Sequence, residues 1–302
     1  MPLVRSVINT HPGLEFLKET PEFQDRYQET VIHRIFYHVN VADSGRISCR
    51  EWTRSDVLDV MTELDEEDDI NKILRYFSYE HFYVVYCKFW ELDTDHDFQI
   101  DREDLLRYGN NALTFRVVDQ IFAQVPRPFK CPVPGRMGYE DFCWFIFSEE
   151  DKTTDVALHY WFRCMDLDCD GRITRHDLSY YFDEQSTRME SLMNEPVLFD
   201  DLVCQLHDML HPETEGVFTM RDMKRERWLS GILFNCMFNI NKFILFETRD
   251  PFLARNNVDA DGNRVSPWDK FAQQEYMRLA SEEDEGGHGG NHEGLDSFDG
   301  DF

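Results

Sequence analysis

Basic residues are scarce in this sequence. Only 31 lysines and arginines stand against 59 aspartates and glutamates, which gives a formal net charge of −28 at pH 7. Nucleic-acid binding depends on Lys and Arg that neutralise phosphates, so this balance argues against a nucleic-acid partner. It favours cations and basic protein surfaces as partners instead.

Long uninterrupted apolar runs are also missing. The N-terminus, MPLVRSVINTHPG, lacks the apolar core of a secretory signal. The most apolar stretch, 229–247, is interrupted by three asparagines and Lys242, so we expect no membrane span. Two interpretations of residues 229–246 stay open, a core helix and a partner-docking helix, and the near-helical spacing of Phe234, Phe238 and Phe243 favours the core.

The eight cysteines are scattered and show no zinc-binding spacing. We interpret them as reduced thiols, which predicts an intracellular protein of the cytoplasm, the nucleus or both. No P-loop, nucleophile elbow or dinucleotide fingerprint is found in the sequence. His207 and His211 lie one helical turn apart, as in zinc proteases, but the acid between them is Asp and no third ligand is evident. We therefore predict that the chain is not an enzyme.

Two twelve-residue stretches carry the strongest pattern in the chain, DTDHDFQIDRED at 93–104 and DLDCDGRITRHD at 166–177. Both place carboxylates at positions 1, 3, 5 and 12 and isoleucine at position 8. A calcium loop takes oxygen ligands from alternate positions, because the intervening side chains point away from the ion. Apolar residues at helical spacing flank both stretches, which predicts two helix-loop-helix units.

The predicted ligands are the acidic side chains, the position-7 carbonyls and, in the second loop, a threonine that holds a water. In the first loop they are Asp93, Asp95, Asp97, Gln99, Asp101 and Asp104. In the second loop they are Asp166, Asp168, Asp170, Arg172, Thr174 and Asp177.

Two features are expected to limit the affinity of these loops. Phe98 occupies position 6, where glycine is normal because the chain turns through positive φ, and the strain can reach about 1–2 kcal/mol. Both loops end in Asp, whose shorter side chain closes bidentately on calcium less well than Glu, so magnesium competes better. We predict Ca²⁺ as the ion, Mg²⁺ as a competitor, and sensor-range rather than buffer-range affinity. His96 and Cys169, at position 4, are expected to be solvent-exposed filler.

Three weaker copies of the loop pattern lie at 40–51, 130–141 and 211–222. Each keeps a glycine at position 6, an apolar residue at position 8 and an acid at position 12, but lacks several acidic ligands. We predict that 93–104 pairs with 130–141 and 166–177 with 211–222 through position 8, and that 40–51 has no evident partner. The expected fold is mainly α, with tandem EF-hand and EF-hand-like units in an elongated array and minor β-pairing between loops.

The predicted domains are an N-terminal EF-hand-like domain at 1–147, a C-terminal EF-hand domain at 148–280 and a disordered acidic tail at 281–302. Periodicity predicts a helix over 22–39. A second helix is expected after the acidic run 65–69, carrying Ile70, Ile73 and Leu74. Ser78 is the expected N-cap of the helix that leads into the first loop.

Several longer runs resemble one known family, the B-double-prime regulatory subunits of protein phosphatase 2A. They are HPGLEFLKETPEF, YFSYEHFYVVYCKFWELDTDHD, FCWFIFSEEDK, HYWFRCMDLDCDGRIT and DKFAQQEY, and the resemblance extends from about His11 to Glu283. It implies an elongated helical protein with two calcium-binding EF-hands, which joins a scaffold subunit to a catalytic subunit and helps to choose phosphoprotein substrates. It also implies that calcium promotes assembly and that the metal positions are the twelve residues named above.

Three departures from the family pattern are visible. Asp177 stands where the family commonly has Glu, and Cys169 stands where it commonly has Gly. The family's long N-terminal extension does not precede residue 1, so we expect a fragment or a short isoform. A rival hypothesis is a free EF-hand calcium sensor or buffer without a phosphatase partner.

Overall fold

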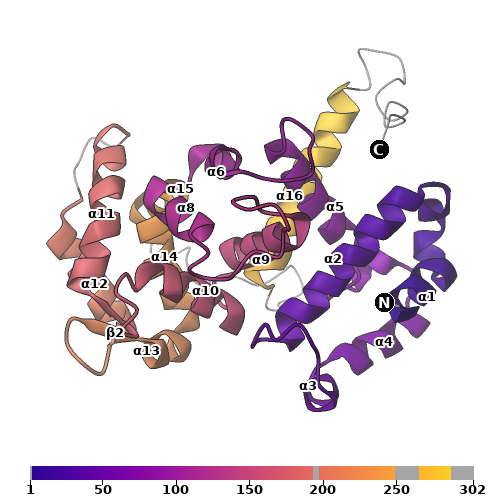
Figure 1. The fold of residues 1–302 in the computed structure, drawn as a ribbon, viewed down its shortest axis with the longest axis horizontal. Coiled ribbons are helices and arrows are strands. Elements are labelled where there is room, and N and C mark those ends of the chain that lie inside the picture. Colours follow the sequence, from indigo (N-terminus) through magenta and orange to yellow (C-terminus); the bar gives the residue numbers. More distant parts are fainter. Residues whose placement is uncertain (1, 193–196, 249–264, 287–302) are drawn as a thin grey trace.

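The structure is a computed structural model that describes residues 2–192, 197–248 and 265–286. The N-terminal elements lie at one end of the long axis, and residues 175–192 and 199–225 lie at the other (Figure 1). The mainly helical, elongated EF-hand architecture predicted from the sequence is confirmed. The elements before the first acidic loop are α1 (Pro2–Thr10), η1 (Pro12–Glu19), α2 (Pro21–Val39), α3 (Cys49–Arg54), α4 (Val57–Glu66), η2 (Ile70–Lys72) and α5 (Tyr79–Leu92).

The first pair of hands follows, and the second pair comes directly after it. The elements of the first pair after α5 are α6 (Arg102–Leu106), α7 (Tyr108–Asn111), α8 (Phe115–Phe122) and α9 (Tyr139–Glu150). Those of the second pair are α10 (Asp155–Met165), β1 (Arg172–Thr174), α11 (Arg175–Glu190), α12 (Phe199–Leu210), β2 (Val217–Thr219) and α13 (Met220–Arg225). The chain continues through α14 (Arg227–Phe238), α15 (Ile240–Thr248) and α16 (Pro267–Gly286).

Position 8 joins the loops as predicted. Ile100 and Met137 exchange two backbone hydrogen bonds of 2.9 and 2.8 Å, and they connect the loops 93–104 and 130–141. In the second pair β1 runs antiparallel to β2, with Ile173 opposite Phe218. All four side chains are buried. Each acidic loop is therefore paired with one of the weaker copies.

The buried apolar side chains form two clusters, and α5 contributes to both. Phe82 belongs to the N-terminal cluster, which the elements from α1 to the start of α5 build. Val85 and Phe89, on the same helix, belong to the larger cluster that runs through both pairs of hands. The clusters do not follow the predicted domain division at residue 147, because α9 crosses that point and is buried along its length.

The C-terminal helix α16 returns to the N-terminal half of the molecule and lies along α5 (Figure 1). Trp268 is buried, and its ring meets Phe147 edge-on at 4.9 Å. Lys88 of α5 pairs with Glu275 of α16 at 2.7 Å. The C-terminal end of the described chain is thereby held against α5.

Some expectations about elements are confirmed. The helix predicted at 22–39 is α2, and the hydroxyl of Ser78 accepts a hydrogen bond from the N–H of His81 and caps α5. None of the eight cysteines, all of which lie in the described ranges, forms a disulfide. No helix in the described ranges is long and apolar enough to cross a membrane.

Other expectations are wrong in whole or in part. The helix expected after residues 65–69 is a short 3₁₀ turn, η2, because the acidic run instead ends α4. The stretch 229–247 is two helices that meet at Asn239, and both bury apolar side chains, so the core interpretation holds over most of its length. Helix α16 continues past the predicted start of disorder at 281 and ends at Gly286, while the rest of the predicted tail lies outside the described residues.

Candidate metal centres

The first loop brings three carboxylates together where α5 ends. One oxygen each of Asp93, Asp95 and Asp97 lies within 4.8 Å of the other two. Asp93 is fully buried, and its Oδ2 accepts a hydrogen bond of 2.9 Å from the N–H of Phe98. Its Oδ1 is also buried but has no hydrogen-bond partner among the described residues. An unpartnered buried carboxylate oxygen beside two further carboxylates suits a hard divalent cation, so these residues fit calcium.

The turn of the first loop has the geometry that the sequence predicts. Phe98 has φ of +60°, in the left-handed region that favours glycine. Its ring packs 4.8 Å from that of Phe89, and the guanidinium of Arg26 lies 3.7 Å above it. These contacts hold a strained residue in place. His96 is exposed, as expected for position 4, and its ring also stacks on that of Trp90 at 4.1 Å.

The second loop repeats the arrangement with a better turn. Oxygens of Asp166, Asp168 and Asp170 again lie within 4.8 Å of one another. Both oxygens of Asp166 accept backbone hydrogen bonds, from Asp170 at 3.1 Å and from Gly171 at 2.9 Å. Gly171 has φ of +81°, which glycine adopts without a Cβ penalty. Cys169 is exposed, as expected for position 4.

The remaining predicted ligands of the first loop contact protein groups. The Asp104 carboxylate accepts from the N–H of Asp101 at 2.8 Å and also contacts Arg107. Asp101 in turn pairs with Arg136 at 3.1 Å. The N–H of Gln99 donates to Asp97 at 2.8 Å. An ion that recruits position 12 must compete with Arg107, which adds a cost to binding at this loop.

In the second loop the position-12 carboxylate caps α11. Asp177 accepts from the N–H of Thr174 at 2.8 Å and from its hydroxyl at 2.6 Å. Its other oxygen accepts from the N–H of Leu167 at 3.3 Å. The N–H of Arg172 donates to Asp170 at 2.8 Å. Asp177 therefore lies apart from the three clustered carboxylates, as Asp104 does in the first loop.

Electrostatics at both loops favour the arrival of a cation. Burial raises the pKa of Asp93, and the charges of Asp95 and Asp97 raise it further. Burial likewise raises the pKa of Asp166, although backbone N–H groups oppose the shift. Repulsion between neighbouring carboxylates contributes a smaller part of each pKa shift, and a bound divalent ion would replace that repulsion by attraction.

The weaker loop at 40–51 places an amide where calcium loops hold their ion. The Nδ2 of Asn40 donates to Ser44 Oγ at 2.9 Å, to the carbonyl of Arg46 at 2.8 Å and, less closely, to Glu51 Oε1 at 3.4 Å. These acceptors stand at positions 5, 7 and 12, which ligate calcium in a competent loop. Asn40 is buried, and its Oδ1 accepts from the N–H of Gly45.

The other two weaker loops also satisfy their last acid internally. Asp141 accepts from Arg127 and from the N–H of Lys130, both at 2.8 Å. Asp222 accepts from the hydroxyl of Thr219 at 2.7 Å. The sequence shows that these loops lack acidic ligands, but it does not identify the hydrogen-bond donors. The loop pattern does not specify which donor groups take the place of the ion.

Comparison with known proteins places EF-hands on most of the chain. A family model described as an EF-hand domain matches residues 1–67, and one described as an EF-hand domain pair matches residues 82–182. The second range contains both acidic loops. The chain therefore contains EF-hand domains, as its loop pattern predicts.

Sequence similarity to named relatives extends over nearly the whole chain. It is 56% identical over 287 residues to the probable B''delta regulatory subunit of serine/threonine protein phosphatase 2A from Arabidopsis thaliana, with 94% of this chain and 52% of that protein covered. It is 49% identical over 284 residues to the human B'' alpha regulatory subunit of serine/threonine-protein phosphatase 2A, with 94% and 25% covered. This chain thus spans about half the length of the first and a quarter of the second.

A solved structure of a PP2A PR70 holoenzyme has a similar fold. The TM-score is 0.73 and the sequence identity 48%, and the match covers 80% of this chain and 89% of that chain. At this identity and coverage the likeness extends to sequence as well as fold.

Proposed function

Because this chain belongs to the family of B'' regulatory subunits of protein phosphatase 2A, we propose that it is a calcium-responsive regulatory subunit of that phosphatase. It binds the scaffold and catalytic subunits, directs the choice of phosphoprotein substrates and performs no catalysis itself. The chain acts inside the cell, in the cytoplasm, the nucleus or both. The observation that carries the calcium response is the pair of carboxylate clusters at Asp93, Asp95 and Asp97 and at Asp166, Asp168 and Asp170.

Calcium is the ion, and magnesium competes for the same oxygens. The clustered carboxylates provide the first ligands, and the full predicted sets add Gln99, Asp101 and Asp104 in one loop and Arg172, Thr174 and Asp177 in the other. Full coordination requires Asp104 and Asp177 to exchange their present hydrogen bonds for the ion. That exchange supports sensor-range affinity, because part of the binding free energy is spent on rearrangement.

Linkage provides the mechanism. An ion that binds the ordered hands stabilises them by RT ln(1 + [L]/Kd), about 2.7 kcal/mol per site at a hundredfold excess over Kd. If the partner subunits recognise helices in the orientation that the ion stabilises, the same free energy favours assembly.

The test is affinity capture of the purified scaffold and catalytic subunits by the 302-residue chain, in calcium and in chelator. We expect recovery to fall at least severalfold in chelator. Asp93→Ala with Asp95→Ala, and Asp166→Ala with Asp168→Ala, should weaken recovery in calcium. Glu213→Ala is the control, since it removes an exposed acid from a weaker loop.

Two outcomes would contradict the proposal. Equal recovery of wild type and variants with and without calcium would remove the calcium control. Calcium binding by the chain without capture of either subunit would instead favour a free sensor or buffer.

A further inference from the structure

The two acidic loops belong to different pairs, so position-8 pairing does not join them. Ile100 pairs with Met137 and Ile173 with Phe218, each within its own pair. A route between the two metal loops must therefore use other contacts. The helices that leave the loops make such contacts.

Helix α11 leaves the second loop and reaches the segment 111–116, which follows the first loop. Glu184 accepts hydrogen bonds from the N–H groups of Phe115 at 2.6 Å and Arg116 at 3.1 Å, and it thereby caps α8. The guanidinium of Arg188 donates to the carbonyl of Leu113 at 2.9 Å and to that of Asn111. We call Glu184 and Arg188 the α11 clamp.

The clamp is connected to both loops through short segments of the chain. Asp177, at position 12 of the second loop, lies in the first turn of α11, and the clamp residues follow about two and three turns later on the same helix. On the other side Arg107 contacts Asp104, position 12 of the first loop, and the chain reaches Asn111 through a short turn whose backbone is left-handed at Gly109 and Asn110. The clamp thus connects the closing residues of the two loops.

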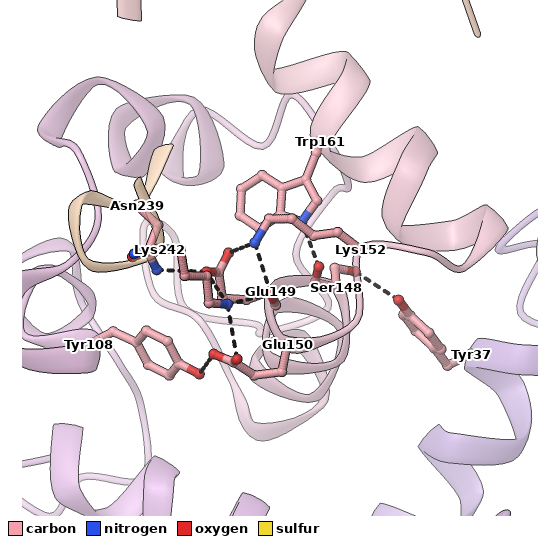
Figure 2. A network of polar contacts seen from close by, with 9 residues as sticks. All are labelled: Tyr37, Tyr108, Ser148, Glu149, Glu150, Lys152, Trp161, Asn239 and Lys242. Carbon is pink, nitrogen blue, oxygen red and sulfur yellow. Dashed lines mark hydrogen bonds and ion pairs between the residues drawn. The ribbon is translucent and has the colours of Figure 1, made fainter. Parts of the chain in front are cut away.

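The same segment also contacts the junction between α14 and α15. The N–H of Thr114 donates to the carbonyl of Phe238 at 2.9 Å, and that of Ile240 donates to Ala112 at 2.8 Å. Tyr108 donates to Glu150 at 2.6 Å, and Figure 2 shows Glu150 in a buried network that continues through Lys242.

That network reaches the helix that enters the second loop. Lys242 and Lys152 both contact Glu149, at 2.9 and 2.5 Å. The Nζ of Lys152 lies 4.9 Å from the ring centre of Trp161, whose indole N–H donates to Ser148 at 2.6 Å (Figure 2). Trp161 belongs to α10, which ends at the first ligand, Asp166. The segment after the first loop is therefore connected to both helices that flank the second loop, to α11 directly and to α10 through this network.

We propose that the two calcium loops bind their ions with positive cooperativity, and that the α11 clamp transmits it between the two pairs of hands. This inference rests on the proposed calcium binding. An ion that orders Asp177 fixes the start of α11, and α11 then holds residues 111–116 in the position that the first hand needs. When the second ion binds, this segment of the chain is already ordered, so the chain loses less conformational entropy in the second binding step.

The test uses site-resolved calcium titrations of the 302-residue chain by NMR. The amides of Phe98 and Gly171 report on the two loops separately, because each donates to the first aspartate of its own loop. Asp93→Asn with Asp95→Asn disables the first loop, and Asp166→Asn with Asp168→Asn disables the second. We expect each loop to bind about fivefold or more weakly when the other is disabled, by the same factor in both directions.

The clamp is tested by Arg188→Met combined with Glu184→Gln. With these changes, disabling one loop should leave the calcium affinity of the other almost unchanged. The affinity of each loop in the chains whose other loop is disabled should match that without the clamp substitutions, which also shows that the hands still fold. Arg225→Met is the matched control. Arg225 donates to the carbonyls of Leu210 and His211 within the second pair, so its loss should leave the coupling intact.

The possible results separate this inference from the proposed function. Two loops that bind calcium independently would overturn the inference and leave the proposed function standing. Coupling that survives the clamp substitutions would overturn the assigned route. If neither amide responded to calcium, the proposed function would fail together with the inference.

Discussion

At the scale of single residues, Phe98 shows how packing can maintain an unfavourable backbone conformation. Its φ of +60° costs about 1–2 kcal/mol for a residue with a Cβ. Its ring is held between Phe89 and Arg26, and a second aromatic contact comes from Tyr139 at 5.8 Å. The aromatic side chain therefore stabilises the loop enough to offset the strain.

This balance predicts the effect of two substitutions. Phe98→Ala and Phe98→Gly both lose the ring, but only the glycine variant also loses the strain. We expect both to unfold at lower urea concentration than the wild type, with the glycine variant more stable than the alanine variant by about 1 kcal/mol.

The second loop provides the control for Phe98. Gly171 has φ of +81°, and nothing lies within 4 Å of an added Cβ, so Gly171→Ala introduces strain without a clash. It should lower the free energy of unfolding by about 1 kcal/mol. An alanine variant of Phe98 as stable as the glycine variant would show that the loop relaxes and stores no strain.

Residue chemistry also marks the limit of prediction from the sequence. The alternating acids indicated that Asp93, Asp95 and Asp97 would converge, because alternation alone places them on one side of a turn. The contacts of Arg107 and Arg136 with Asp104 and Asp101 were not predicted. Arg107 lies three residues after the twelve-residue pattern ends and Arg136 belongs to the paired loop 130–141, so that pattern encodes neither contact.

At the scale of elements, the loop 40–51 keeps the calcium-loop form without an acidic ligand set. The side-chain N–H groups of Asn40 supply the partial positive charge that an ion would otherwise supply. They donate hydrogen bonds of 2.9 Å to Ser44 Oγ and 2.8 Å to the carbonyl of Arg46. The loop is therefore expected to stay ordered whether or not calcium is present.

Asn40→Asp should make the order of the loop 40–51 depend on calcium. The substitution replaces the amide donor by a carboxylate. Without a bound ion, this carboxylate would face the Glu51 carboxylate and the Arg46 carbonyl with no hydrogen between these oxygens, and they would repel one another. We expect a lower melting temperature than wild type in chelator and a larger gain on adding calcium, because the new carboxylate adds a ligand. Asn71→Asp, outside any loop, is a control for the added charge. An unchanged calcium response would argue against the role assigned to Asn40.

Elements were predicted well where the pattern of apolar residues extends over many residues, and poorly where it covers only a few. The stripe of α2 identified a helix of nineteen residues within one residue of its ends. The acidic run 65–69 suggested a helix start, yet Val57, Val60 and Leu64 form the buried stripe of α4, which ends in that run. Ile70 and Ile73 are buried by a 3₁₀ turn instead, and nothing in their spacing distinguishes the two outcomes.

At the scale of the whole molecule, the two hydrophobic clusters share α5. One part of this helix packs with the N-terminal cluster and the other with the cluster that contains both metal loops. Helix α16 reinforces the connection, since Arg278 pairs with Glu91 at 2.6 Å and Lys88 with Glu275. The shared helix could not be predicted from the sequence, because the predicted division lies at residue 147, within α9, and no sequence feature marks α5 as common to both clusters.

This sharing predicts that calcium stabilises parts of the molecule that do not contact it. If α5 joins the clusters into one cooperative unit, ions at 93–104 and 166–177 raise the free energy of opening everywhere, by up to about 2.7 kcal/mol per site at a hundredfold excess over Kd. Hydrogen exchange of the buried stripe of α4, Val57–Glu66, should therefore slow in calcium, although α4 lies outside both pairs of hands. The chain with Asp93→Asn, Asp95→Asn, Asp166→Asn and Asp168→Asn should show no such slowing. Slower exchange in α9 and α10 with unchanged exchange in α4 would mean that the N-terminal cluster opens on its own and that α5 transmits no stability between the two.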